Sequence, residues 1–170
     1  MIFLRGRLDD ALASSASAEL LLAAQLPGVD AIELYVDSPG GSIAAALAVS
    51  DVLRMIGPRA ATVCTGVAGG AAVLVLAAGG ASRRMALPHA RIHLTDDLVD
   101  LAPARFDAPE VYAEEARRAT ARWRSALVQV VRQSPDQLAS DMAAGRWLSA
   151  AEAVEYGIVD RIGINRGPLH

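Results

Sequence analysis

Hydrophobic and polar positions along the chain switch between two kinds of pattern. Short apolar or alternating stretches, typical of strands, lie at residues 1–5, 31–36, 61–65, 82–86, 91–94 and 157–162. Longer stretches that favour helices lie between them, at residues 10–25, 42–56, 71–78 and 110–132. This succession predicts a single α/β domain over residues 1–170, with a mostly parallel sheet and covering helices.

Capping residues mark where several helices begin and end. Ser42 is a candidate N-cap and Gly57 the corresponding C-terminal stop. Ser134 and Ser149 are each followed, three residues later, by a Gln or a Glu, which is the pattern of a helix start. Residues 96–109 contain four aspartates and two prolines and are expected to form a loop.

Composition limits the classes of function. The chain has 170 residues, of which 53% are hydrophobic and only 4% aromatic, so the core is expected to be aliphatic. The net charge is −3 and no basic run is present, which argues against a nucleic-acid partner. All 16 basic residues are arginines, so no lysine can act as a general base or form a Schiff base.

Neither a membrane span nor a metal or cofactor site is expected. Residues 60–81 are uncharged, but five glycines interrupt them and their alanines are only weakly apolar. The N-terminus lacks the pattern of a signal peptide, so a soluble cytoplasmic protein is expected. Cys64 is the only cysteine, which excludes an internal disulfide, and its apolar surroundings predict a buried thiol. No zinc-ligand spacing is present.

Two glycine-rich turns are the most informative motifs. One follows the strand at Tyr35, reading Tyr-Val-Asp-Ser-Pro-Gly-Gly-Ser, and the other follows Cys64, reading Cys-Thr-Gly-Val-Ala-Gly-Gly-Ala-Ala. Each reads as a strand that enters a turn and then a helix. Two such turns would bring free backbone N–H groups to one edge of the sheet, as in an oxyanion hole. The tip of the second turn, where a nucleophile would stand, is Gly70.

These motifs resemble the Clp protease proteolytic subunits, within the ClpP/crotonase superfamily. The resemblance covers nearly the whole chain, and its specific parts are Asp37-Ser-Pro-Gly-Gly-Ser42, Cys64-Thr-Gly66, Ala86-Leu-Pro88 with Arg91, and Trp147-Leu-Ser-Ala-Ala-Glu-Ala-Val-Glu-Tyr-Gly-Ile-Val-Asp160. It implies a ClpP/crotonase-like fold with a protruding handle at about residues 96–132. It also implies rings that stack through the handle and work with a Clp ATPase.

Carried over residue by residue, the resemblance places the family's serine, histidine and aspartate at Gly70, Thr95 and Gly145. In a triad the serine needs a base, and the base needs an orienting acid. Gly70 offers no nucleophile, Thr95 cannot act as a base near neutral pH, and Gly145 has no side chain to orient a base. The family's oxyanion donors are backbone N–H groups, which fall on Gly41 and Ala71. Those donors do not depend on side chains, so they can persist.

The resemblance therefore predicts a subunit without the triad, with a structural or regulatory role in a ring made of itself or of other Clp-type subunits. The helix at 110–132 combines Tyr112, Trp123 and Leu127 with arginines, which suits a subunit interface. The sequence starts at the family's first core strand, without the axial segment that meets the ATPase, so independent gating by an unfoldase is not expected.

Two other classes of function stay open. One is a peptidase or esterase with relocated chemistry, in which His93 is the fallback base, because it precedes Thr95 by two residues on the same strand. The other is a module that binds a peptide or acyl carbonyl between the Gly41 and Ala71 donors. A crotonase-type acyl-CoA enzyme is a weaker alternative, since the chain is short for that family.

Overall fold

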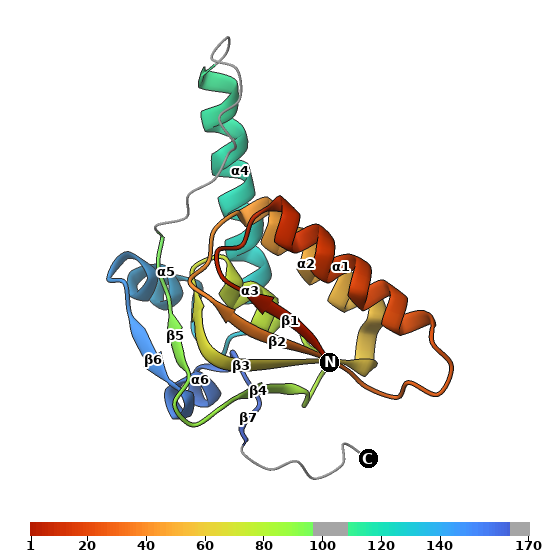
Figure 1. The fold of residues 1–170 in the computed structure, drawn as a ribbon. Helices are drawn as coiled ribbons and strands as arrows, with labels where there is room; N and C mark the ends of the chain where they lie inside the picture. Colours follow the sequence, from red (N-terminus) through yellow and green to blue (C-terminus); the bar gives the residue numbers. More distant parts are fainter. Residues whose placement is uncertain (97–108, 164–170) are drawn as a thin grey trace.

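The computed structural model describes residues 1–96 and 109–163, and its elements pack around one sheet (Figure 1). The strands are β1 (Ile2–Arg5), β2 (Ile32–Ser38), β3 (Ala60–Gly69), β4 (Arg84–Ala86), β5 (Arg91–His93), β6 (Trp147–Ser149) and β7 (Arg161–Ile162). The helices are α1 (Asp10–Gln25), α2 (Ile43–Ile56), the 3-10 helix η1 (Gly57–Arg59), α3 (Ala72–Ala77), α4 (Pro109–Val128), α5 (Pro135–Ala143) and α6 (Ala150–Tyr156). The prediction of an α/β fold is confirmed.

The described strands form a mostly parallel sheet. Strands β1, β2, β3, β4 and β7 lie side by side in that order and run parallel. Strand β5 pairs in parallel with the far end of β3, and β6 pairs with β5 in the antiparallel direction. In β2, Ile32, Leu34 and Val36 are buried while the residues between them are only half-buried, as the alternating pattern predicts. Helices α1, α2 and α3 pack on this sheet and bury an aliphatic core.

The helix caps are confirmed. The side chain of Ser42 accepts a hydrogen bond from Ala45 N, and Gly57 ends α2. Ser134 caps α5 through Gln137 N, and Ser149 forms a complete capping box at the start of α6. These local signals are readable in the sequence because each depends on residues only three or four positions apart.

Strand β3 is longer than predicted. It continues through Gly66 to Gly69, so the predicted end at residue 65 is wrong. A Cβ atom at Gly66 would overlap the carboxylate of Asp37, which accepts a hydrogen bond from Val67 N at 3.1 Å. Glycine therefore allows Asp37 to lie against the strand, and the extra length of β3 carries the sheet from β4 to β5.

Helix α4 projects from the body of the molecule, but its base belongs to the core (Figure 1). Trp123 and Leu127 are fully buried, and the Trp123 indole N–H donates to the Ala71 carbonyl at 3.3 Å. The prediction that these two side chains serve a subunit interface is wrong, because they fill this chain's own interior. The helix also ends at Val128 rather than at residue 132. The side chain of Tyr112 and the rest of the predicted handle, residues 97–108, lie outside the described residues.

A largely buried ion pair fastens β4 to the turn before β7. Arg84 Nη2 lies 2.5 Å from Asp160 Oδ1, and Arg84 Nε lies 3.1 Å from Oδ2. Burial alone would raise the pKa of the Asp160 carboxyl, but the hydrogen bonds and the charge of Arg84 outweigh burial, so this pKa lies below its ordinary value. The pair therefore stabilises the fold above the unfolded carboxyl pKa, and this stabilisation is lost as the pH falls through the lowered folded value.

We expect Asp160→Asn to cost about 2 kcal/mol of unfolding free energy at neutral pH, because it leaves Arg84 without its counter-charge. The difference in melting temperature between wild type and variant should narrow as the pH falls below about 4. Thermal melts at several pH values measure this. A difference that is constant from pH 7 to pH 3 would contradict the assignment.

Candidate functional site

The two glycine turns lie against each other where β2 and β3 end. A Cβ atom placed on Gly40 would lie 2.6 Å from the Gly69 carbonyl oxygen and 3.2 Å from Ala71 N. A Cβ atom on Gly69 would lie 2.6 Å from the Pro39 carbonyl oxygen. Side chains at these positions would push the turns apart, so glycine is what allows the close approach. The structure thus brings the two turns together, as their sequences predict.

The backbone around Gly41 is held from both sides. Leu8 N donates to the Gly40 carbonyl at 2.9 Å, and Ser42 N donates to the Leu8 carbonyl at 2.7 Å. Within the described residues, neither Gly41 N–H nor Ala71 N–H donates a hydrogen bond. Both N–H groups are therefore available to an oxygen atom of a ligand, the property required of oxyanion donors.

Gly70 immediately precedes Ala71 and offers no side chain. Its φ is +46°, in the left-handed region that favours glycine, and its N–H donates to the His93 carbonyl at 3.0 Å. The buried helix α3 follows immediately, starting at Ala72. The hydrogen bond to His93 and the following helix α3 therefore fix the turn, although its tip carries no nucleophilic side chain.

The other two positions lie on either side of the end of β5. Thr95 is 8% exposed and follows β5 by two residues. Gly145 has a φ of +63° and lies in the connection between α5 and β6. Leu94 N donates to the Arg146 carbonyl at 2.8 Å and ties the two segments together. The three sequence-predicted positions therefore meet around the end of β5, but together they supply one hydroxyl, no base and no acid.

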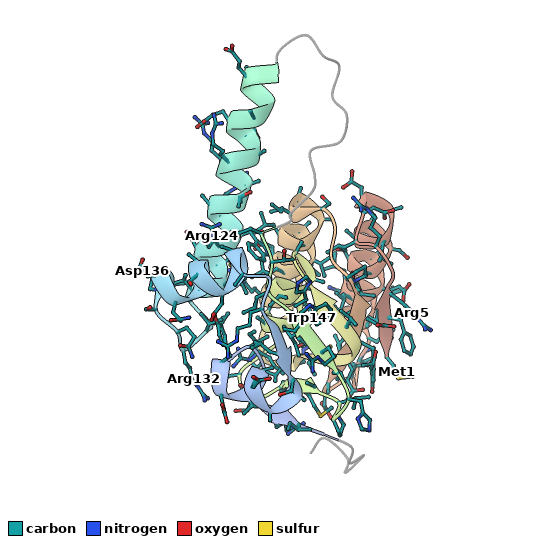
Figure 2. The ribbon with its side chains drawn as sticks, turned by 90° about the vertical axis from the view of Figure 1, so that its left-hand side faces the viewer. Met1, Arg5, Arg124, Arg132, Asp136 and Trp147 are labelled. Atoms are coloured by element: carbon teal, nitrogen blue, oxygen red, sulfur yellow. The ribbon has the colours of Figure 1, made fainter. Side chains whose placement is uncertain are left out.

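His93, the fallback base, points toward Gly145. Its imidazole stacks on the indole of Trp147, with ring centroids 4.2 Å apart and planes 7° from parallel. Its Nε2 lies 3.6 Å from the position that a Cβ atom of Gly145 would occupy. Figure 2 shows Trp147 on the face of the molecule turned toward the viewer. The sequence did not predict this stack, because it depends on the pairing of β5 with the three-residue strand β6.

The remaining candidate reactive groups lie elsewhere. Cys64 is buried in β3, and its burial, reinforced by the nearby Asp37 carboxylate, raises the pKa of the thiol to about 12. The thiol is therefore protonated at neutral pH, and the prediction of a buried cysteine is confirmed. His89 is exposed in the turn after Pro88. Among the described residues, no cluster of His, Cys, Asp and Glu side chains could hold a metal ion.

The comparison with known families decides which family this fold belongs to. The sequence pattern of the Clp protease family matches residues 1–166. The chain belongs to the Clp protease family. The ClpP/crotonase-like fold and the family resemblance of the glycine turns are thereby confirmed.

Three relatives show how similar this Clp-family chain is to proteins named as Clp proteolytic subunits. An ATP-dependent Clp protease proteolytic subunit-like protein of Streptomyces coelicolor is 41% identical over 165 residues, which cover 95% of this chain and 77% of that relative. The ATP-dependent Clp protease proteolytic subunit of Dehalococcoides mccartyi is 37% identical, with 95% and 80% covered. The proteolytic subunit 1 of Shouchella clausii is 33% identical, with 95% and 83% covered.

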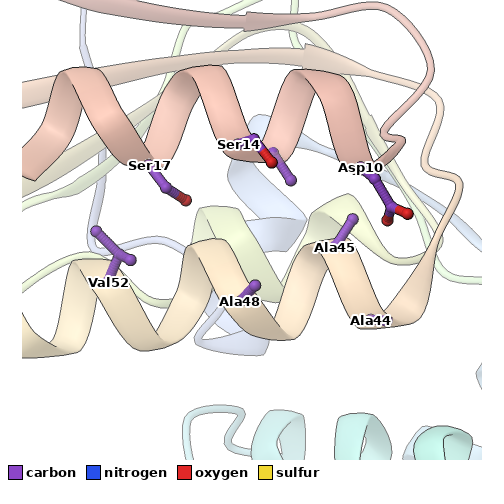
Figure 3. Close-up of a pocket in the computed structure, with 8 residues that line it drawn as sticks. Asp10, Ser14, Ser17, Ala44, Ala45, Ala48 and Val52 are labelled. Atoms are coloured by element: carbon purple, nitrogen blue, oxygen red, sulfur yellow. The ribbon is translucent and has the colours of Figure 1, made fainter.

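This member of the Clp family also has a groove of about 600 Å³ between α1 and α2 (Figure 3). Alanines and serines line most of it, with Asp10 at one end and Val52 at the other. The candidate site residues Gly70, Thr95, Gly145, Gly41 and Ala71 do not line this groove, and the sequence did not predict it. None of the described helices has the length and hydropathy needed to cross a membrane.

Proposed function

We propose that this Clp-family chain is a non-catalytic subunit that takes a structural or regulatory part in a ring, built from copies of itself or with other Clp-type subunits. The observation that carries this proposal is the absence of a nucleophile, a base and an acid at Gly70, Thr95 and Gly145. Loss of a complete triad costs a serine protease about a million-fold in kcat. The roughly 10³–10⁴-fold help from oxyanion donors and binding alone is too small for useful proteolysis.

Relatives named as ATP-dependent proteolytic subunits support the assembly part of the proposal. A subunit without catalytic activity can complete a ring, hold a peptide, or change the activity of neighbouring subunits. A Clp ATPase would then act on the assembled ring rather than on this chain alone.

We predict that the purified protein will not react with a fluorophosphonate probe and will not cleave a fluorogenic peptide above background. A probe of this kind needs an activated serine, and Gly70 has no hydroxyl. Labelling and peptide hydrolysis measure this, with an active Clp proteolytic subunit as the positive control. Saturable cleavage that disappears in His93→Ala would instead favour the relocated hydrolase.

We predict an oligomer that depends on the exposed part of α4. Arg117 and Arg118 are 70% and 65% exposed and both pair with Glu114 on their own helix. Reversing both charges to Glu places three acidic groups together and should shift the solution mass toward smaller species, because exposed like charges repel. Light scattering at micromolar concentration measures the mass. The matched control is Arg54→Glu on α2, and a monomeric wild type would contradict the proposal.

A second candidate function is the binding of a peptide or acyl carbonyl by the Gly41 and Ala71 donors. The specific observation in its favour is that both N–H groups lack an acceptor within the described residues. A peptide aldehyde that perturbs the amide resonances of these two residues would support it. The two candidates are compatible, because a ring subunit can hold a peptide without cutting it.

A further inference from the structure

Because Gly145 has no side chain, the space at its missing Cβ position, called the gap below, lies next to the Nε2 atom of His93. The nearest heavy atom to the missing Cβ position is His93 Nε2 at 3.6 Å, which is an ordinary contact distance. A small group can therefore occupy the gap without displacing the imidazole. Whatever group enters it meets Nε2 first.

The His93 imidazole is held in orientation by stacking, while its ring nitrogens form no hydrogen bond within the described residues. Its stacking on Trp147 holds the ring plane. Within the described residues, neither ring nitrogen of His93 takes part in a hydrogen bond. A donor that is already oriented loses little conformational freedom when it binds, so it can contribute more of its interaction energy to affinity.

The two carboxylates near this site are already engaged in hydrogen bonds. Glu152 accepts hydrogen bonds from both the N–H and the hydroxyl of Ser149, at 2.8 Å each. Asp141 accepts from Tyr156, Gln137 and Arg146.

Arg91 is exposed on the same strand as His93, and its charge acts on the Glu152 carboxylate, where it helps to hold the pKa of Glu152 below its ordinary value, after the larger effect of the hydrogen bonds from Ser149. Its guanidinium carbon lies 5.9 Å from the centre of the Trp147 ring. With Nε2 protonated, the group that completes this site is an acceptor, and an anionic one forms the stronger, charge-assisted bond.

We propose that the gap beside Gly145 is a carboxylate-binding subsite for a peptide, with His93 Nε2–H as its donor. The carboxylate comes from the C-terminus of the peptide or from an acidic side chain. A peptide is the fitting ligand because the neighbouring Gly41 and Ala71 N–H groups suit a carbonyl oxygen. This subsite deepens the proposed function, on which it rests: the chain holds a peptide that it does not cleave.

The test uses the full chain with ¹⁵N-labelled histidines. The protein has three histidines, and the His93 ring signals are assigned by their loss in His93→Phe, which keeps an aromatic ring against Trp147 but removes the donor. The probes are acetyl-Ala-Ala-Leu with a free C-terminus, the same peptide as its C-terminal amide, and acetyl-Ala-Asp-Ala-amide. The first and third probes distinguish the two sources of the carboxylate.

We expect at least one carboxylate peptide to shift the His93 Nε2 signal saturably, while the exposed His89 stays unchanged. By calorimetry, the neutral amide and the His93→Phe variant should each show roughly tenfold weaker binding, the scale of one lost hydrogen bond to a charged group. Equal binding of the amide and the acid would overturn the proposal. So would the absence of a His93 shift at millimolar peptide.

A second variant provides an internal ligand. Gly145→Asp places a carboxylate in the gap, so it should shift the His93 ring signals without peptide and remove the preference for the carboxylate peptides over the neutral amide. A preference as strong as in wild type would contradict the subsite. These readouts do not depend on turnover. Peptide cleavage would contradict the non-catalytic role but not the subsite. A His93 ring signal that does not shift with peptide would contradict the subsite but not the non-catalytic role.

Discussion

Replacing Gly70 with serine alone is expected to give no peptidase, whereas the triple variant Gly70→Ser, Thr95→His, Gly145→Asp gains measurable hydrolysis of a short fluorogenic peptide. The three positions meet around the end of β5, and the Gly41 and Ala71 N–H groups are already available. A triad acts as a unit, so its members are strongly non-additive. We expect the triple variant to exceed the single one by roughly a thousandfold or more.

His93 complicates this restoration in a testable way. An aspartate at position 145 would have its Cβ atom 3.6 Å from His93 Nε2. In the triple variant its carboxylate could therefore pair with His93 instead of the new histidine at position 95. Adding His93→Phe to the triple variant should therefore raise its activity, because the aspartate is left to orient the new histidine alone. Activity of Gly70→Ser comparable to that of the triple variant would show that a base already exists in this chain.

The second large effect is on stability, at Gly41. A Cβ atom at this position would overlap the carbonyl group of Leu8, and the φ of +145° is itself unfavourable for any residue with a side chain. We expect Gly41→Ala to cost about 3–5 kcal/mol, since backbone rather than a flexible side chain must move. For a chain of this size that corresponds to a fall in melting temperature of about 10 °C.

Gly28→Ala is the matched control. Gly28 also has a positive φ, +77°, but nothing lies within 4 Å of its missing Cβ position. Gly28→Ala should therefore lower the free energy of unfolding only by the conformational cost of the positive φ, about 1–2 kcal/mol. Equal losses in the two variants would show that strain alone, and not the contact with Leu8, makes glycine necessary at position 41.

Local signals explain why much of the fold could be predicted. The alternation in β2 and the caps at Ser42, Ser134 and Ser149 depend on neighbours in sequence, so they are readable without tertiary contacts. The meeting of the two glycine turns was also predictable, because parallel strands end at the same edge of a sheet.

Contacts between distant segments account for what the sequence did not predict. Strand β3 passes through Gly66 because Asp37, from another strand, fills the place of a side chain. Trp123 is buried inside this chain, where α4 packs against α2 and α3, and helical periodicity cannot distinguish such burial from burial by a partner. The stack of His93 on Trp147 needs the pairing of two three-residue strands, which are too short to show a period.

The positive φ angles of Gly70 and Gly145 have a consequence for the mutational paths open to this sequence. At +46° and +63°, any other residue introduced there pays a conformational cost. If the chain is the non-catalytic subunit proposed above, substitutions at Gly70 or Gly145 alone lower stability and are expected to return no activity, because the three groups of a triad function only together. On that proposal, a working triad is expected only when several positions change together, and not by one substitution at a time.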